Sequence, residues 1–205
     1  MNKQKYIDDI QEIRKIMDRS TRFISLSGIS GVLSGFFALI AAYLAYETVY
    51  SGQNYMEFRK ADLSIESLFQ LVIIGSICIV LSVATGIYFT TRKARRNNQS
   101  IFDHQAKQML LSLFIPLATG GLLCLILLFK GAVALVAPLT LIFYGLALIN
   151  ASKYATQSMM TLGLVEIMIG LAATWWLGYG LLFWALGFGV MHIIYGIAIY
   201  IKDKA

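Results

Sequence analysis

Two ionisable side chains in the last third of the chain, Glu166 and His192, are of the types that accept and donate protons in proteins. Both occur inside long apolar runs. If the membrane spans over these runs begin near Ala155 and Leu181, each residue lies 11 positions into its helix, or about 16 Å at the helical rise. Because the hydrocarbon core is roughly 30 Å thick, both side chains are predicted near the membrane midplane.

Apart from tyrosines and cysteines, Glu166 and His192 are the titratable side chains predicted near mid-membrane. A charge at that depth costs roughly 3 kcal/mol on insertion scales, so it normally faces the bundle interior and finds a partner. Burial favours the neutral carboxyl group unless the imidazole is close enough to share its proton. Two interpretations stay open: a structural hydrogen bond between neighbouring helices and a polar intramembrane site with a function.

Seven glycines at one repeated spacing accompany these residues. In the last two apolar runs a glycine lies three residues before the Glu or His and another four residues after it, and the first run repeats the pattern with glycine in the middle. The glycines are Gly163, Gly170, Gly189, Gly196, Gly28, Gly31 and Gly35. Such steps keep residues on one helix face. Because small residues let helices approach closely in lipid, these glycines are predicted to be helix-packing positions.

The composition is that of a membrane protein with several spans. The chain has 205 residues, of which 58% are apolar and 14% charged, against roughly 25% charged in soluble domains. Its apolar runs predict six spans, at about residues 22–46, 68–91, 109–129, 131–150, 155–176 and 181–201. The predicted fold is therefore all-α, a six-transmembrane-helix bundle over residues 22–205 made of three hairpins.

Residues 1–21 are predicted to form a short amphipathic helix outside the bilayer. Its apolar stripe steps by four, three and four residues through Tyr6, Ile10, Ile13 and Met17. Such a stripe can lie on the membrane surface, or it can pair with a second copy or with a cytoplasmic protein partner. The charged face carries both signs, which favours protein pairing. The first apolar run, about 24 residues long, exceeds the apolar region of a cleavable signal peptide and is predicted to be retained.

The distribution of basic residues predicts the orientation. The N-terminal segment, the second loop, the fourth loop and the C-terminus together hold 14 lysines and arginines, whereas the other side holds three. Basic loops remain in the cytoplasm, so both termini are predicted to be cytoplasmic. The lipid bilayer is thus the first partner that the sequence predicts. The predicted location is a bacterial cytoplasmic (inner) membrane.

Several kinds of site are not predicted. No spacing typical of a metal site, a cofactor or a phosphate-binding loop occurs. Cys78 and Cys124 fall inside predicted spans and are interpreted as small buried hydrophobes. The basic second loop is explained by topology and anionic lipid, so no nucleic-acid partner is expected.

The tetrapeptide Gly28-Ile29-Ser30-Gly31 resembles the Gly-x-Ser-Gly motif of rhomboid intramembrane proteases, which also have six spans and a histidine in the last. That resemblance implies a nucleophilic serine. Here, however, the serine lies in the first span rather than the fourth and among packing glycines, and a motif outside its structural context is weak. No catalytic residue is therefore predicted.

Over its whole length the chain resembles an uncharacterised family of small six-span bacterial inner-membrane proteins that begin with a charged helix. The resemblance is carried by Tyr6-Ile7-Asp8-Asp9-Ile10 and by Ser25-Leu26-Ser27-Gly28. It implies the six-span fold and no particular activity. The glycine-rich hairpins also resemble, more loosely, acid-resistance proteins with six spans.

Three hypotheses about function are consistent with these patterns. The first is a non-enzymatic interaction or regulatory protein that acts through its cytoplasmic N-terminal helix. The alternative is a small proton-linked transporter that uses Glu166 and His192. A third is an intramembrane enzyme. The scarcity of polar residues along the spans places the transporter second, because transport requires a wet path.

Overall fold

The computed structural model describes residue 10 and residues 27–50, 64–96 and 104–202. Within these residues the protein is all-α, and six helical segments are long and apolar enough to cross a membrane. The side chains that point outward from them are mostly large and apolar, and they include Ile77 and Val80 of the second span and Phe114 and Ile115 of the third. The chain is therefore an integral membrane protein with a six-helix bundle.

The first three spans are single helices. They are α2 (Gly28–Tyr50), α3 (Ile65–Arg96) and α4 (His104–Phe129). The second and third are longer than the predicted 68–91 and 109–129, because the polar segments that flank the apolar runs continue as helix. Arg, Lys and Gln are good helix formers, so the helices extend past the apolar run.

The last three spans are less regular. The fourth consists of a 3₁₀ turn η1 (Val133–Leu135), α5 (Val136–Ala151) and a second 3₁₀ turn η2 (Ser152–Tyr154). The fifth is α6 (Gln157–Trp175). The sixth joins η3 (Leu177–Tyr179), α7 (Gly180–Trp184), a π-helix η4 (Ala185–Met191) and α8 (His192–Lys202). The segment 177–180, which lies between the predicted fifth and sixth spans, is thus helical.

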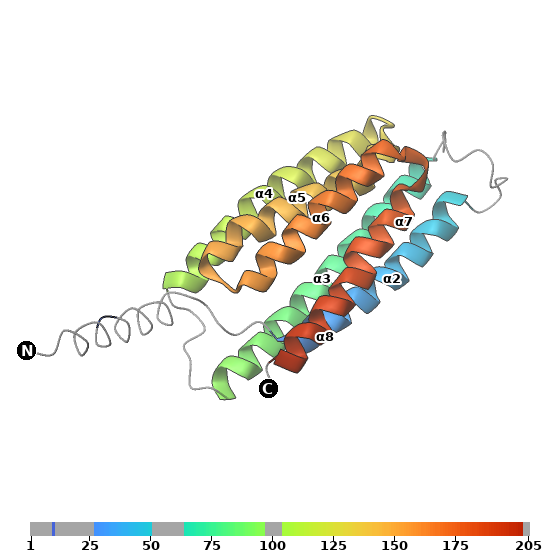
Figure 1. The fold of residues 1–205 in the computed structure, drawn as a ribbon. Coiled ribbons are helices and arrows are strands. Elements are labelled where there is room, and N and C mark those ends of the chain that lie inside the picture. Colours follow the sequence, from blue (N-terminus) through green and yellow to red (C-terminus); the bar gives the residue numbers. More distant parts are fainter. Residues whose placement is uncertain (1–9, 11–26, 51–63, 97–103, 203–205) are drawn as a thin grey trace, which may run out of the picture.

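The six spans pack as two groups of three (Figure 1). In one group α5 lies between α4 and α6, and in the other α2 lies between α3 and the sixth span. The expectation of three hairpins is correct for the first two pairs of spans but wrong for the last, because α6 and the sixth span touch each other far less than α6 touches α5. We call the boundary between the two groups the seam.

Glycines explain this arrangement. On α8, a Cβ added to Gly196 would lie 2.5 Å from the backbone nitrogen of Val32 and 2.7 Å from the carbonyl oxygen of Gly28, both on α2. On α6, a Cβ added to Gly163 would lie 2.7 Å from the carbonyl oxygen of Gly145 on α5. Each glycine row thus brings its helix against a helix of its own group, at distances that other residues do not allow.

The remaining glycines of the predicted set occupy similar places. A Cβ on Gly31 would lie 3.1 Å from the Cα of Gly196, and one on Gly170 would lie 3.0 Å from the carbonyl oxygen of Pro138. A Cβ on Gly35 or on Gly189 would likewise meet atoms of the facing helix, at the point where α2 crosses η4. The predicted packing glycines therefore lie at two helix–helix contacts, one in each group.

We expect Gly196→Ala to destabilise the protein by about 1–3 kcal/mol, because the new methyl group meets backbone atoms of α2 that cannot rotate away. Thermal unfolding of the purified protein in detergent measures this. Gly121→Ala in α4 is the matched control, since nothing lies within 4 Å of a Cβ there, and alanine favours helix over glycine. Equal stability of the two variants would contradict close packing of α2 against α8.

Candidate functional site

Glu166 lies at the centre of α6 and is completely buried, with 0% of its surface exposed. It lies nine positions after Gln157 and nine before Trp175, the two ends of the helix, so it is about 14 Å along the helix axis from either end. The carboxyl group thus lies midway along the fifth span.

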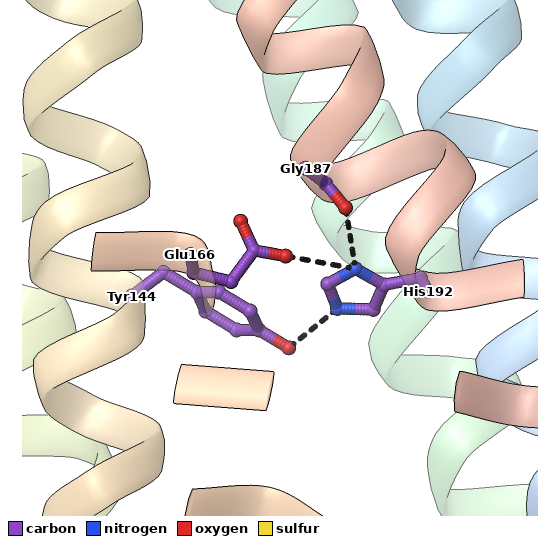
Figure 2. Close-up of polar contacts among 4 residues, drawn as sticks. All are labelled: Tyr144, Glu166, Gly187 and His192. Carbon is purple, nitrogen blue, oxygen red and sulfur yellow. Dashed lines mark hydrogen bonds and ion pairs between the residues drawn. The ribbon is translucent and has the colours of Figure 1, made fainter. Parts of the chain in front are cut away.

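His192 begins α8, directly after the π-helix η4, and is 8% exposed. Its Nδ1 atom lies 3.1 Å from the carbonyl oxygen of Gly187. A carbonyl oxygen only accepts, so Nδ1 carries a hydrogen and donates it. In the neutral ring Nε2 is then an acceptor, and the hydroxyl of Tyr144, 2.7 Å away, donates to it (Figure 2).

The carboxyl group of Glu166 approaches the same ring from the other group of helices. Its Oε1 atom lies 3.5 Å from Nδ1 of His192, which is longer than an N–H···O hydrogen bond and makes this an electrostatic contact. Neither carboxyl oxygen has a hydrogen-bond partner among the described residues. Burying an ionised carboxylate without donors is costly, so a proton or another positive charge has to balance Glu166.

Gly187 allows this approach. A Cβ at this position would overlap Oε2 of Glu166 and would lie 2.5 Å from Cδ2 of Leu141. Only a residue without a side chain lets the carboxyl group pack against the backbone of η4. The π-helix is itself a rare conformation that is frequently found at functional sites. Here it carries Gly187, whose carbonyl oxygen holds the histidine ring (Figure 2).

The site bridges the seam. Tyr144 and Glu166 come from α5 and α6, whereas Gly187 and His192 come from η4 and α8 of the other group. Figure 2 shows the Tyr144 hydroxyl and the Glu166 carboxyl group both pointing toward the imidazole. The two groups of helices are thus joined, midway along their spans, by polar contacts between ionisable side chains.

Sequence reasoning missed Tyr144, because tyrosines were set aside when the mid-membrane titratable residues were counted. A usable signal was present. Tyr144 lies 11 residues after Val133 and 10 before Tyr154, at the centre of its span, and a tyrosine hydroxyl at that depth needs a hydrogen-bond partner. The same depth argument that singled out Glu166 and His192 applies to it.

The other candidate residues lie elsewhere. Ser30 of the rhomboid-like motif donates to the carbonyl oxygen of Ser27 at 2.6 Å, while both ring nitrogens of His192 contact other groups. No cluster of three His, Cys, Asp or Glu side chains suited to a metal occurs in the part of the chain that the structure describes. Of the predicted N-terminal helix, Ile10 alone is described, and it is helical; Tyr6, Ile13 and Met17 lie outside the described residues.

Comparison of the chain with protein-family models, with curated proteins and with solved structures found no match. The family resemblance drawn from the sequence therefore stays a prediction.

Proposed function

We propose that the protein is a small proton-linked transporter in which Glu166 takes up and releases the proton. The observation that carries this proposal is the carboxyl group itself, which is fully buried at the seam and has no hydrogen-bond donor within the described residues. Ionisable residues inside a membrane are costly, and they commonly mark proton and substrate pathways. The protein is non-enzymatic in this proposal.

The chemistry of the three side chains supports proton transfer. Imidazole can hold a proton on either nitrogen, and here one nitrogen contacts Tyr144 while the other faces Glu166. The nitrogen 3.5 Å from the carboxyl group, Nδ1, already carries the hydrogen that it donates to Gly187, so a proton that passes from Glu166 to the ring ends on Nε2, the nitrogen that contacts Tyr144. The pair can therefore exist as neutral acid and neutral imidazole, or as carboxylate and imidazolium, with the same total charge.

The location at the seam supports coupling to movement. When Glu166 and His192 carry opposite charges they attract across the seam, and when only His192 is charged this attraction is lost. Transporters commonly move one group of helices against the other around a site at the midplane. A proton that enters or leaves at Glu166 would change how strongly the two groups hold together.

The orientation belongs to the same proposal. We place the protein in a bacterial inner membrane with both termini in the cytoplasm, on the strength of the 14 basic residues on one side against three on the other. Arg92, Lys93, Arg95 and Arg96 end α3, Lys107 lies in the first turn of α4, and Lys202 ends α8.

The test combines proton uptake with distances across the seam. Spin labels at Leu164 of α6 and Ile194 of α8, both about half exposed at 48% and 50%, span the seam in a chain whose Cys78 and Cys124 are replaced by alanine. The distance between them should change from acidic to alkaline pH, with release of one proton per chain. Labels at Leu146 and Leu164, within one group, are the control and should keep their distance. If the cross-seam distance is constant across pH, the coupling of protonation to movement is refuted.

A second role, interaction through the N-terminal helix, is supported by Ile10. This residue is helical, and 64% of its surface is exposed. An apolar side chain so exposed outside the bundle suits an amphipathic helix that pairs with a second copy or with a cytoplasmic protein. This role is compatible with transport, because it occupies a different part of the chain.

Changing Ile10 and Ile13 to Asp is expected to abolish self-association or partner binding, because two charges in the apolar stripe cannot be buried in a helix pair. Membrane insertion should be unchanged, since the spans are intact. Crosslinking in membranes measures association. The control is Glu12→Gln, on the charged face of the predicted helix. Association that survives the double change would exclude this role.

A further inference from the structure

Among the described residues, one polar contact links the pair of Glu166 and His192 to a further side chain, the hydroxyl of Tyr144. Both carboxyl oxygens of Glu166 are buried and have no hydrogen-bond partner in the described part of the chain. Nδ1 of the imidazole faces the carbonyl oxygen of Gly187 at 3.1 Å and Oε1 of Glu166 at 3.5 Å. The other ring nitrogen, Nε2, lies 2.7 Å from the Tyr144 hydroxyl (Figure 2). A proton that follows these contacts to Glu166 therefore passes through the oxygen of Tyr144.

The exposure of the three side chains increases in the same order. Glu166 is 0% exposed and His192 is 8% exposed, whereas Tyr144 is only partly buried. The helices α5, α6 and α7 and the π-helix η4 carry no ionisable side chain besides Tyr144 and Glu166, so they offer no other acid or base. Tyr144 is thus the member of the site that a proton from outside the pair can reach first.

The hydrogen positions on the ring suit transfer toward Glu166. Because Nδ1 donates to a carbonyl oxygen and Nε2 accepts from Tyr144, the ring has a hydrogen on the side of the carboxyl group and a lone pair on the side of the hydroxyl. A tyrosine hydroxyl is both a donor and an acceptor. It can therefore give its own hydrogen to Nε2 while its oxygen takes up another. A phenol oxygen that holds two hydrogens is a very strong acid, so the two hydrogens have to move together.

We propose that Tyr144 is the relay residue through which Glu166 takes up its proton. The inference rests on the proposed proton-linked function and names the route of the proton at that site. A hydronium ion forms a new O–H bond on Tyr144, whose own O–H bond breaks as Nε2 of His192 takes that hydrogen. The N–H bond at Nδ1 breaks as the carboxylate of Glu166 takes its hydrogen. One proton enters, the carboxylate becomes a neutral carboxyl group, and the ring stays neutral with its hydrogen on Nε2. Release follows the same steps in reverse.

The test follows the protonation of Glu166 in time, with the full-length protein in lipid nanodiscs. A light flash releases protons from a caged acid, and infrared spectroscopy records the growing carbonyl band of the protonated carboxyl group. Tyr144→Phe should reach the final band of the parent at least about tenfold more slowly, because the group that acts as acid and base is gone. A lower final band reached at the rate of the parent would mean that Tyr144 is structural, and would overturn the relay.

Tyr195→Phe is the matched control. Tyr195 lies one turn after His192 on α8 and is also partly buried, but the hydrogen bonds of the ring within the described residues go to Tyr144 and Gly187. Loss of its hydroxyl should leave the rate of protonation unchanged. A Tyr195→Phe protein as slow as Tyr144→Phe would contradict a relay specific to Tyr144.

A measurement on the parent protein tests the relay without any substitution. Because two hydrogens move together at Tyr144, the rate should fall along a curve as D₂O replaces H₂O. A straight line would mean that a single hydrogen moves, and the relay would be wrong. If Tyr144→Phe is protonated as fast as the parent, the relay fails and the proton-linked function stands. If the parent itself shows no carboxyl band, both proposals fail.

Discussion

Glu166→Gln is expected to abolish proton uptake and the pH-dependent change of distance across the seam, while the protein still folds. An amide has nearly the shape of the carboxyl group but does not take up or release a proton in the physiological pH range. Because the carboxyl oxygens of the parent accept no hydrogen bond within the described residues, the amide gives up none of those contacts. We expect the stability of the variant to lie within about 1 kcal/mol of the parent.

Proton uptake is measured by a pH jump on protein in nanodiscs with an indicator dye. Glu66→Gln removes an exposed carboxylate instead of the buried one and should change neither proton uptake at the seam nor the distances. If Glu166→Gln takes up protons and moves as the parent does across the pH range, Glu166 is a structural residue. The transporter hypothesis would then lose its chemical support.

The second large effect is expected at His192, which contacts both Tyr144 and Glu166. Tyr144→Phe removes the donor to Nε2 and leaves a buried nitrogen unsatisfied, at a cost of about 1–3 kcal/mol. His192→Gln should cost a similar amount. The double variant should cost less than the sum, by roughly 1 kcal/mol, because both single changes remove the same hydrogen bond.

In the corresponding double-mutant cycle, with Glu166→Gln, His192→Gln and both changes together, the free energies of unfolding should also be non-additive, but by a smaller amount. The two side chains are 3.5 Å apart and share no hydrogen bond, whereas Tyr144 and His192 are 2.7 Å apart. Unfolding of all variants in mixed detergent micelles gives the free energies. Strict additivity in both cycles would mean that the three side chains do not interact, and the arrangement at the seam would be wrong.

Much of the fold could be predicted because apolar length is a direct consequence of bilayer thickness. The depth of Glu166 followed from counting residues along one helix, which needs no tertiary information. The ends of the spans were less accurate, since α3 continues to Arg96. The end of an apolar run marks where a helix leaves the bilayer. The helix itself continues beyond that point when the residues that follow are good helix formers.

The partners of each helix could not be predicted from spacing alone. Glu166 and His192 are flanked by glycines at the same spacing, and the last two spans were expected to form a hairpin. In the structure Gly163 contacts Gly145 of α5, and Gly196 contacts α2. A row of glycines on one helix shows that another helix packs closely against it. Which helix packs there depends on the small residues of that other helix, and the spacing on the first helix does not reveal them.

The site was predicted in part. Two of its side chains were found by their charge, but Tyr144 acts through a hydrogen bond to a residue 48 positions later, and such a pairing is visible only after folding. The π-helix at Ala185–Met191 was not expected either. Its glycines, Gly187 and Gly189, occur in a sequence that an ordinary α-helix would also accept.

The central claim, that Glu166 changes its protonation state inside the folded protein, is tested most directly by infrared difference spectroscopy. A protonated carboxyl group has a carbonyl stretch that the carboxylate lacks. Spectra of the parent at acidic minus alkaline pH should contain this band, shifted by ¹³C labelling of glutamate and retained in Glu66→Gln. In Glu166→Gln the band should be absent. A parent spectrum identical to that of Glu166→Gln would contradict the proposal that a proton is exchanged at the seam.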